Sequence, residues 1–201
     1  MKKIAVFASG NGSNLQALIN AIKEGFLQAE IAVLVCDRQG AFAIERAKAT
    51  AIPTFVFSPK DYIDKKAYEA EILAHLKNSQ IDFIILAGYM RLVGSTLLQA
   101  YENRIINIHP ALLPSFPGLL VQQKAIDWGV RYSGATVHFV IPDVDMGPII
   151  SQAVVPVLQD DTEETLSARI LKEEHRIYPE AVKLFFEGRL EVRNNRVFIL
   201  D

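Results

Sequence analysis

The sequence predicts an α/β fold: a Rossmann-like open twisted sheet, mostly parallel, with helices on both faces and a C-terminal antiparallel hairpin. As far as residue 108, short apolar β-branched runs alternate with stretches of helical spacing. After residue 118 two strands follow each other closely instead. Apolar strands alternating with helices are typical of a parallel sheet covered on both faces, with right-handed crossovers.

Composition indicates one globular domain, for which an enzyme of the cytoplasm is the default interpretation. The chain has 201 residues, half of them hydrophobic, and a formal net charge of −2, so neither a nucleic acid nor a membrane is an expected partner. Cys36 is the single cysteine and lies within a predicted strand, which favours a reducing, cytoplasmic location. The apolar start MKKIAVFAS resembles a signal peptide only briefly, because GNGSN interrupts it. We expect a monomer or a weak homodimer.

The first half of the chain predicts five strands and four helices. The first helix has Leu15, Leu18, Ile19 and Ile22 at helical spacing and Gly25 as its C-terminal stop. The predicted strands are 3–8, 30–36, 54–57, 82–87 and 104–108, and the later helices are 41–50, 64–78 and 91–101.

The second half predicts strands, a capped helix and a tail. Strands 135–141 and 149–157 form an antiparallel pair around the loop PDVDMGP. A capping box between Asp161 and Glu164 starts a helix that Pro179 breaks or kinks, and a second helix ends at Gly188. Asn194-Asn195 turns a final hairpin over 190–200.

We interpret residues 1–201 as a single domain with three functional parts. These are an N-terminal half (1–100), a second half (101–188) and a hairpin tail (189–201).

A glycine-rich turn, SGNGSNL, joins the first strand to the first helix. Such a turn offers backbone N–H groups and the positive helix end to an anion, and Ser13 or Asn14 can cap the helix or bind an oxyanion. Dinucleotide binding with Asp37 as the ribose acceptor is an alternative, but Leu15 replaces the third glycine of that fingerprint. A tight turn without a ligand is equally compatible with this segment.

Asn107 and His109 interrupt an apolar strand just before a loop that contains Pro110, Pro114 and Pro117. Alternation along the strand places both side chains on one face, at the sheet edge where ligands of open α/β sheets bind. The amide can donate to an oxyanion, and the imidazole can donate or move a proton near neutral pH. The stiff loop then serves to hold both groups in place. His75 and His138 lack this context and are interpreted as structural.

The loop PDVDMGP contains two acids, Asp143 and Asp145. A carboxylate close to His109 would favour the protonated imidazolium. Spacing alone does not choose between the two acids, and solvated loop acids are the structural interpretation.

These segments together resemble the phosphoribosylglycinamide formyltransferase family of folate-dependent formyltransferases. The resemblance rests on ASGNGSNLQAL, LAGYMRLV at 86–93, INIHPALLPSFPG at 106–118, SGATVHFV at 133–140, DVDMGPII at 143–150 and EEHRIYPEAV at 173–182. It covers the whole length in order. It implies transfer of a formyl group from 10-formyltetrahydrofolate to the amine of 5-phosphoribosylglycinamide in purine biosynthesis, with no metal.

The resemblance also implies a role for each matched residue. The catalytic residues are Asn107, His109 and Asp145, and Asp145 is chosen over Asp143 because it precedes x-Gly-Pro. The phosphoribosylglycinamide is bound by Gly12, Ser13, Asn14 and Glu174. The folate co-substrate is bound by Lys65, Met90, Arg91, Leu92, Val93 and Asn107. On this basis residues 1–100 are expected to form the phosphate-binding half and residues 101–188 the catalytic and folate-binding half.

The chain departs from the family pattern at Val121, Gln122 and Gln123, where many members carry a histidine and small residues.

Two alternative functions stay open: a formyltetrahydrofolate deformylase-like hydrolase and a non-catalytic module that binds phosphate esters. A deformylase normally carries an additional N-terminal domain, and a methionyl-tRNA formyltransferase carries a basic C-terminal domain. On this ground the glycinamide transferase is preferred to both.

Overall fold

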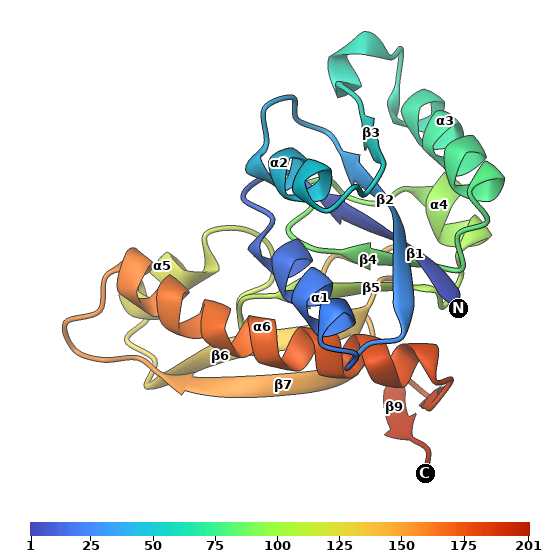
Figure 1. The fold of residues 1–201 in the computed structure, drawn as a ribbon. Coiled ribbons are helices and arrows are strands. Elements are labelled where there is room, and N and C mark those ends of the chain that lie inside the picture. Colours follow the sequence, from blue (N-terminus) through green and yellow to red (C-terminus); the bar gives the residue numbers. More distant parts are fainter. The chain divides into compact units, whose positions relative to one another are not determined.

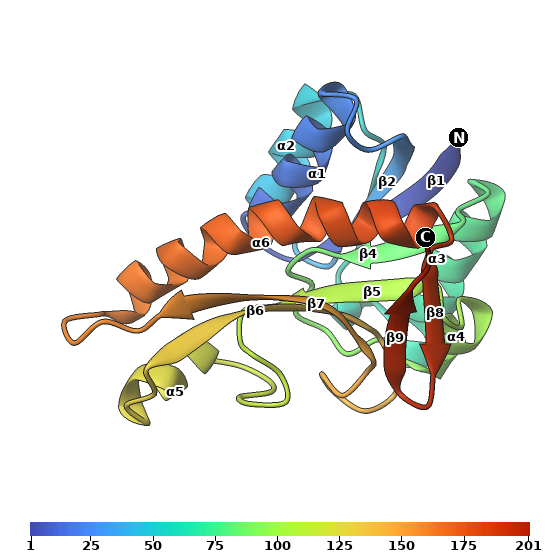
Figure 2. The same cartoon turned by 90° about the horizontal axis from the view of Figure 1, so that it is seen from below.

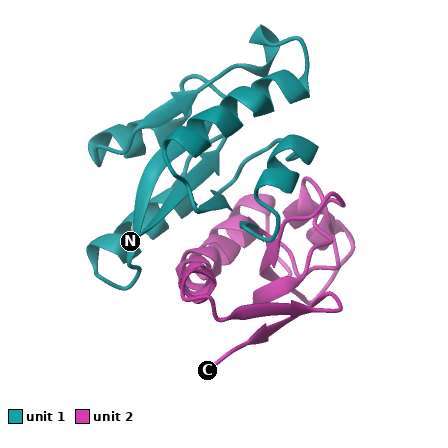
Figure 3. Cartoon of the chain, turned by 90° about the vertical axis from the view of Figure 1, so that its right-hand side faces the viewer, with its two compact units in different colours: residues 1–106 teal, residues 107–201 magenta.

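A computed structural model describes residues 1–201 and divides the chain into two compact units (Figure 3). The first unit contains Met1–Ile106 and the second contains Asn107–Asp201. Strand β5 (Ile105–His109) begins in the first unit and ends in the second.

The first unit is built from alternating parallel strands and helices (Figure 1). Its strands pair in parallel in the order β3-β2-β1-β4. Right-handed crossovers then place α1 and α2 on one face and α3 and α4 on the other. The elements are β1 (Lys2–Ala8), α1 (Ser13–Lys23), β2 (Ala29–Cys36), α2 (Phe42–Ala49), β3 (Thr54–Val56), a 3₁₀ turn (Pro59–Asp61), α3 (Lys65–Asn78), β4 (Phe83–Leu86) and α4 (Ser95–Ala100).

The second unit pairs two long antiparallel strands, β6 and β7, with one long helix, α6, packed against both (Figure 2). A two-stranded hairpin follows α6, and its turn residues Asn194 and Asn195 both have positive φ. The elements are α5 (Val121–Asp127), β6 (Tyr132–Phe139), β7 (Ile149–Pro156), α6 (Glu163–Phe186), β8 (Leu190–Arg193) and β9 (Arg196–Ile199). The backbone ladder of the main sheet runs β3-β2-β1-β4-β5-β6-β7, which confirms the predicted fold class.

Burial explains why these segments form these elements. Ile4 to Ala8 of β1 are fully buried in succession, as expected for a strand covered on both faces. Helix α6 instead buries one stripe at helical spacing, which includes Leu166, Ile170, Ile177 and Phe185.

Two helix predictions were wrong at their boundaries. The helix expected over 91–101 begins only at Ser95, because Gly94 is extended and its N–H is bound by the carboxylate of Glu69. Helix α6 is capped by Thr162, whose side chain accepts from Thr165 N–H, rather than by a box between Asp161 and Glu164. The Asp161 carboxylate instead binds Arg169 at 2.7 and 2.8 Å.

The break predicted at Pro179 is also wrong, because α6 runs from Glu163 to Phe186 as one helix with Pro179 inside it. Proline costs a helix one hydrogen bond. Residues on both sides of Pro179 are buried and the helix packs on β6 and β7, and this burial offsets the loss.

A second difference is α5, which begins in the unusual segment Val121–Gln123, where no helix was expected.

Candidate active site

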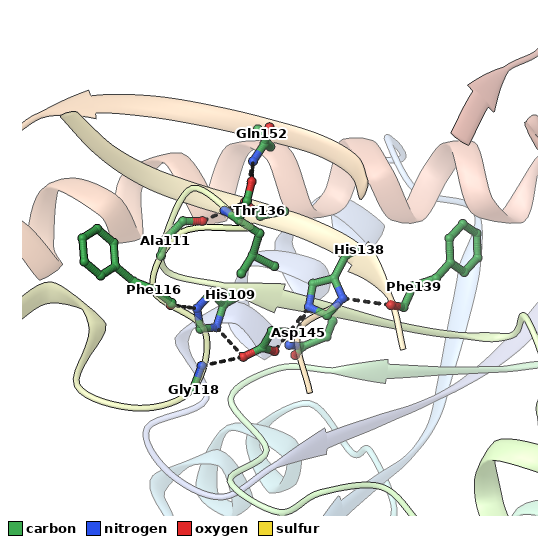
Figure 4. A network of polar contacts seen from close by, with 11 residues as sticks. His109, Ala111, Phe116, Gly118, Thr136, His138, Phe139, Asp145 and Gln152 are labelled. Atoms are coloured by element: carbon green, nitrogen blue, oxygen red, sulfur yellow. Dashed lines mark hydrogen bonds and ion pairs between the residues drawn. The ribbon is translucent and has the colours of Figure 1, made fainter. Parts of the chain in front are cut away.

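The end of β5 carries His109 into a buried polar network (Figure 4). The Nε2–H of His109 donates to the backbone oxygen of Phe116 at 2.9 Å. The other ring nitrogen, Nδ1, lies 3.5 Å from Oδ2 of Asp145. Only 6% of the imidazole and 12% of the carboxylate are exposed, so water screens their interaction little. The carboxylate and the imidazole therefore face each other in a buried setting.

Asp145 is the acid of the β6–β7 loop that reaches this network. Its Oδ2 also accepts the N–H of Gly118 at 2.9 Å, so the carboxylate connects the proline loop to the β6–β7 loop. The neighbouring acid Asp143 is exposed. Asp145 and Phe116 have φ of 54° and 55°, a region that is strained for side chains of this size. Strained backbone of this kind clusters at functional sites.

Gly147 explains the Asp-x-Gly-Pro pattern of the same loop. A Cβ atom at Gly147 would lie 1.8 Å from the backbone oxygen of Phe139. The two backbone segments approach this closely because the N–H of Phe139 donates to the backbone oxygen of Pro148 at 2.9 Å. Only glycine permits the turn that directs Asp145 inward.

His138 belongs to this network, although its strand position alone did not distinguish it from structural histidines. Its Nδ1–H donates to the backbone oxygen of Phe139 at 2.8 Å, and its Nε2 lies 3.2 Å from the amide nitrogen of Asn107. Burial lowers the pKa of His138 below its ordinary value, so the ring is neutral and Nε2 accepts from the amide. The signal available in the sequence was the alternation of Thr136 and His138 on one face of β6.

The two histidines flank the two oxygens of one carboxylate. Oδ1 of Asp145 lies 3.6 Å from Nε2 of His138, whereas Oδ2 faces His109. His138 fixes one hydrogen of the Asn107 amide nitrogen and leaves the second available. The network therefore contains an amide with one hydrogen left to donate, and an imidazole whose two nitrogens face Phe116 O and the Asp145 carboxylate.

A second set of hydrogen bonds holds the loop that follows His109. The fully buried hydroxyl of Thr136 donates to Ala111 O at 2.7 Å and accepts from Leu113 N–H at 3.1 Å. The Gln152 amide donates to Leu113 O at 2.9 Å and to the same hydroxyl at 3.0 Å. Side chains of β6 and β7 thus hold the proline loop in place, in addition to the stiffness that its prolines provide.

In the first unit, the glycine turn forms the start of α1. Gly12 is the N-cap residue, with φ of 74°, and a Cβ there would lie 2.7 Å from the Ala43 side chain. Ser13 and Asn14 are the first residues of α1. Arg46 of α2, which the sequence analysis did not single out, donates to the backbone and side-chain oxygens of Asn11 at 2.9 and 3.0 Å.

The predicted folate segment 90–93 also lies in the first unit, after β4. Arg91 donates to Oδ2 of Asp37 at 2.7 Å. The other oxygen of Asp37 is buried, so this carboxylate presents no accessible acceptor to a ribose and the dinucleotide interpretation is unsupported. Lys65 is the exposed first residue of α3.

The predicted site residues fall in both units. Asn107, His109 and Asp145 come together in the second unit, where Glu174 is a buried residue of α6. No group of three or more His, Cys, Asp or Glu side chains is arranged to hold a metal ion, and no helix is long and apolar enough to cross a membrane.

An amide and an imidazole on one strand of a Rossmann-type sheet, close to a carboxylate from the β6–β7 loop, form an arrangement typical of enzymes that transfer acyl groups through an oxyanion. A family model described as formyl transferase matches residues 2–182, and the chain belongs to that family. A phosphoribosylglycinamide formyltransferase of Bacillus subtilis is 51% identical over 91% of this chain and 94% of its own length. Its counterpart from Escherichia coli is 37% identical over 98% and 92%.

Solved structures share the fold closely. Glycinamide ribonucleotide transformylase 1 from Symbiobacterium toebii superposes with a TM-score of 0.98 at 49% identity, over all of this chain and 95% of that one. A formyltetrahydrofolate deformylase from Pseudomonas syringae has a TM-score of 0.92 at 29% identity, over all of this chain and 66% of that one. The fold is therefore common to relatives that are named for different reactions.

Proposed function

We propose that the protein transfers the formyl group of 10-formyltetrahydrofolate to the amine of 5-phosphoribosylglycinamide in purine biosynthesis. The products are formylglycinamide ribonucleotide and tetrahydrofolate. The names of the similar proteins support this substrate pair. The observation that carries the chemistry is the 3.5 Å contact between His109 and Asp145 in the network that contains Asn107.

The reaction needs a stabilised oxyanion and a route for one proton. As the glycinamide amine forms a bond to the formyl carbon, the carbonyl oxygen gains a negative charge and the nitrogen a positive one. Asn107 and protonated His109 donate hydrogen bonds to that oxygen. Asp145 stabilises the imidazolium and helps the proton leave the attacking nitrogen. The bond from carbon to the folate nitrogen then breaks, and that nitrogen receives the proton.

Apart from Asn107, the residues assigned to substrate binding lie outside this network. Backbone N–H groups at Gly12, Ser13 and Asn14 can bind the phosphate at the start of α1. Glu174 contacts the glycinamide part in this proposal. Lys65 and the segment Met90, Arg91, Leu92 and Val93 bind the folate, and Asn107 contacts both the folate and the oxyanion.

Hydrolysis is the second candidate, because the deformylase from Pseudomonas syringae shares this fold. In that reaction water replaces the glycinamide amine as the nucleophile. The same oxyanion donors serve both reactions, so the nucleophile has to be identified by experiment.

A single assay tests the proposal. Purified protein is mixed with 10-formyltetrahydrofolate, with and without 5-phosphoribosylglycinamide, and loss of the formyl group is followed together with formation of formylglycinamide ribonucleotide. Formyl loss that requires the amine and matches product formation supports transfer. Equal loss without the amine identifies a hydrolase. Binding of the phosphate ester without any formyl loss identifies a non-catalytic module.

A further inference from the structure

The segment Met90–Val93, here called the folate strip, presents apolar side chains without regular secondary structure. Met90 is 63% exposed and Leu92 is 61% exposed, on either side of Arg91. No helix or strand lies between Leu86 and Ser95. A loop that binds a ligand through such side chains loses affinity if it must first be ordered, so its anchors matter for binding.

Side chains of the first unit hold the folate strip at its start, middle and end. The hydroxyl of Ser9 accepts Met90 N–H at 2.9 Å. Asp37 holds the guanidinium of Arg91 at 2.7 Å. Glu69 accepts the N–H of Gly94, the residue that directly follows the strip, at 2.6 Å. The third contact, between Glu69 and Gly94, is the one for which no function has been given so far.

Glu69 is a buried acid of helix α3, with 2% of the residue exposed. Burial raises its pKa, and hydrogen bonds from Gly94 and Leu97 N–H together with nearby Lys65 oppose that shift. Gly94 is the N-cap of α4, so the carboxylate binds free N–H groups at the start of that helix. A buried acid is costly unless such donors surround it.

Gly94 is shaped to accept this carboxylate. A Cβ atom at Gly94 would lie 2.6 Å from Oε2 of Glu69 and 3.0 Å from Cε of Lys65. The side chain of Glu69 therefore fills the space that a side chain at residue 94 would need. Glu69 is the common neighbour of Lys65 and of the end of the folate strip.

We propose that Glu69 is a positioning residue that holds the folate strip in its binding conformation through Gly94, without touching the reacting atoms. The inference rests on the proposed function, because it assumes that the strip binds 10-formyltetrahydrofolate. Since Asn107, His109 and Asp145 lie in the other unit, loss of Glu69 affects folate affinity rather than the chemical step.

The test is Glu69→Ala, measured by steady-state kinetics and by hydrogen exchange. KM for 10-formyltetrahydrofolate should rise about 3- to 10-fold, the cost of ordering a released segment. The kcat and the KM for 5-phosphoribosylglycinamide should stay within about twofold. Amide exchange in a peptide that covers residues 88–97 should accelerate. Glu69→Gln should recover most of the loss, because its amide oxygen can still accept Gly94 N–H.

A matched control separates positioning from general loss of helix stability. Asp64→Ala removes the N-cap bond of the same helix to Ala67 N–H, at 2.7 Å, without touching the folate strip. It should leave KM for the folate unchanged. Gly94→Ala should raise the folate KM as Glu69→Ala does, and the double variant should lose less than the product of the two effects.

Three results would overturn the inference. These are an unchanged folate KM in Glu69→Ala, an equal rise of KM in Asp64→Ala, or a fall in kcat alone. Failure of the proposed function is recognised separately, because the wild-type protein would then show no formyl transfer and no saturable binding of the folate in an equilibrium titration. The exchange experiment would still report whether Glu69 orders residues 88–97.

Discussion

The amide nitrogen of Asn107 lies 3.2 Å from Nε2 of His138, a histidine on the neighbouring strand that burial keeps neutral. His138 is itself fixed by its bond to Phe139 O. The donor proposed for the oxyanion is therefore oriented by a partner that has no proton of its own at that nitrogen. The five predictions that follow test this network and the loops that support it.

Asn107→Ala removes one oxyanion donor and should lower kcat by roughly 10²- to 10³-fold, the range for loss of one such donor. The measurement is initial-rate kinetics of formyl transfer at saturating substrates, with circular dichroism to confirm the fold. A variant that keeps nearly full turnover would remove Asn107 from this role.

Asp145→Asn keeps the shape of the side chain but removes the charge beside His109. Turnover should fall by roughly 10²- to 10⁴-fold, and the pH profile of kcat/KM should shift, because the imidazolium loses its stabilising carboxylate. The exposed neighbour provides the control: Asp143→Asn should be close to wild type. An unchanged pH profile in Asp145→Asn would make Asp145 a loop acid only.

His138→Gln should change how stability depends on pH. Because burial lowers the pKa of His138 below 6.5, the unfolded chain binds a proton that the folded chain does not in the window just below 6.5. The free energy of unfolding therefore rises with pH through this window, and the stability present above it is lost as the pH falls. The variant should show a flatter curve in urea unfolding from about pH 5 to about pH 8.

His75→Gln is the control for that experiment, since His75 packs on Phe55 with ring centroids 5.0 Å apart, in the first unit. It should retain the wild-type pH dependence. If His138→Gln and the wild type have parallel curves, the ring is not held neutral by burial.

Thr136→Val should destabilise the loop after His109. The change leaves Ala111 O and Leu113 N–H without the hydroxyl partner that they share, at a cost of about 1–3 kcal/mol in the free energy of unfolding. Urea unfolding measures this cost, and Thr54→Val on an exposed strand position is the control that should change little. Equal stability of the two variants would contradict the anchoring role of Thr136.

Gly147→Ala should displace the β6–β7 loop and Asp145 with it. The added Cβ would meet Phe139 O at 1.8 Å, and relief of such a contact costs about 1–3 kcal/mol of stability. Activity should fall together with stability. Gly10→Ala, with no atom within 4 Å of the added Cβ, should fold as stably as the wild type.

Much of this site could be predicted because it depends on local patterns. The alternation of Asn107 and His109 and the proline loop can be read from neighbouring residues. His138 could not be assigned in this way, because its role depends on pairing between β5 and β6, and a single strand histidine resembles a packing residue. The contact between Glu69 and Gly94 joins residues 25 positions apart and has no local signature.

The errors in the fold have the same origin. Pro179 breaks an isolated helix by the local rule, yet α6 continues because it packs on β6 and β7 and buries residues on both sides of Pro179. The start of α4 moved to Ser95 because Glu69 binds Gly94 N–H from another helix. Each difference reflects tertiary contacts that override local preference.

The bond from His109 Nε2 to Phe116 O has a consequence for the order of events in a catalytic cycle. With Nδ1 directed at Asp145, both ring nitrogens are engaged by the protein itself. Under the proposed function, an incoming formyl oxygen therefore has to replace Phe116 O as the acceptor of the imidazole N–H. The imidazole then becomes a donor to the reacting carbonyl only once that carbonyl is in place.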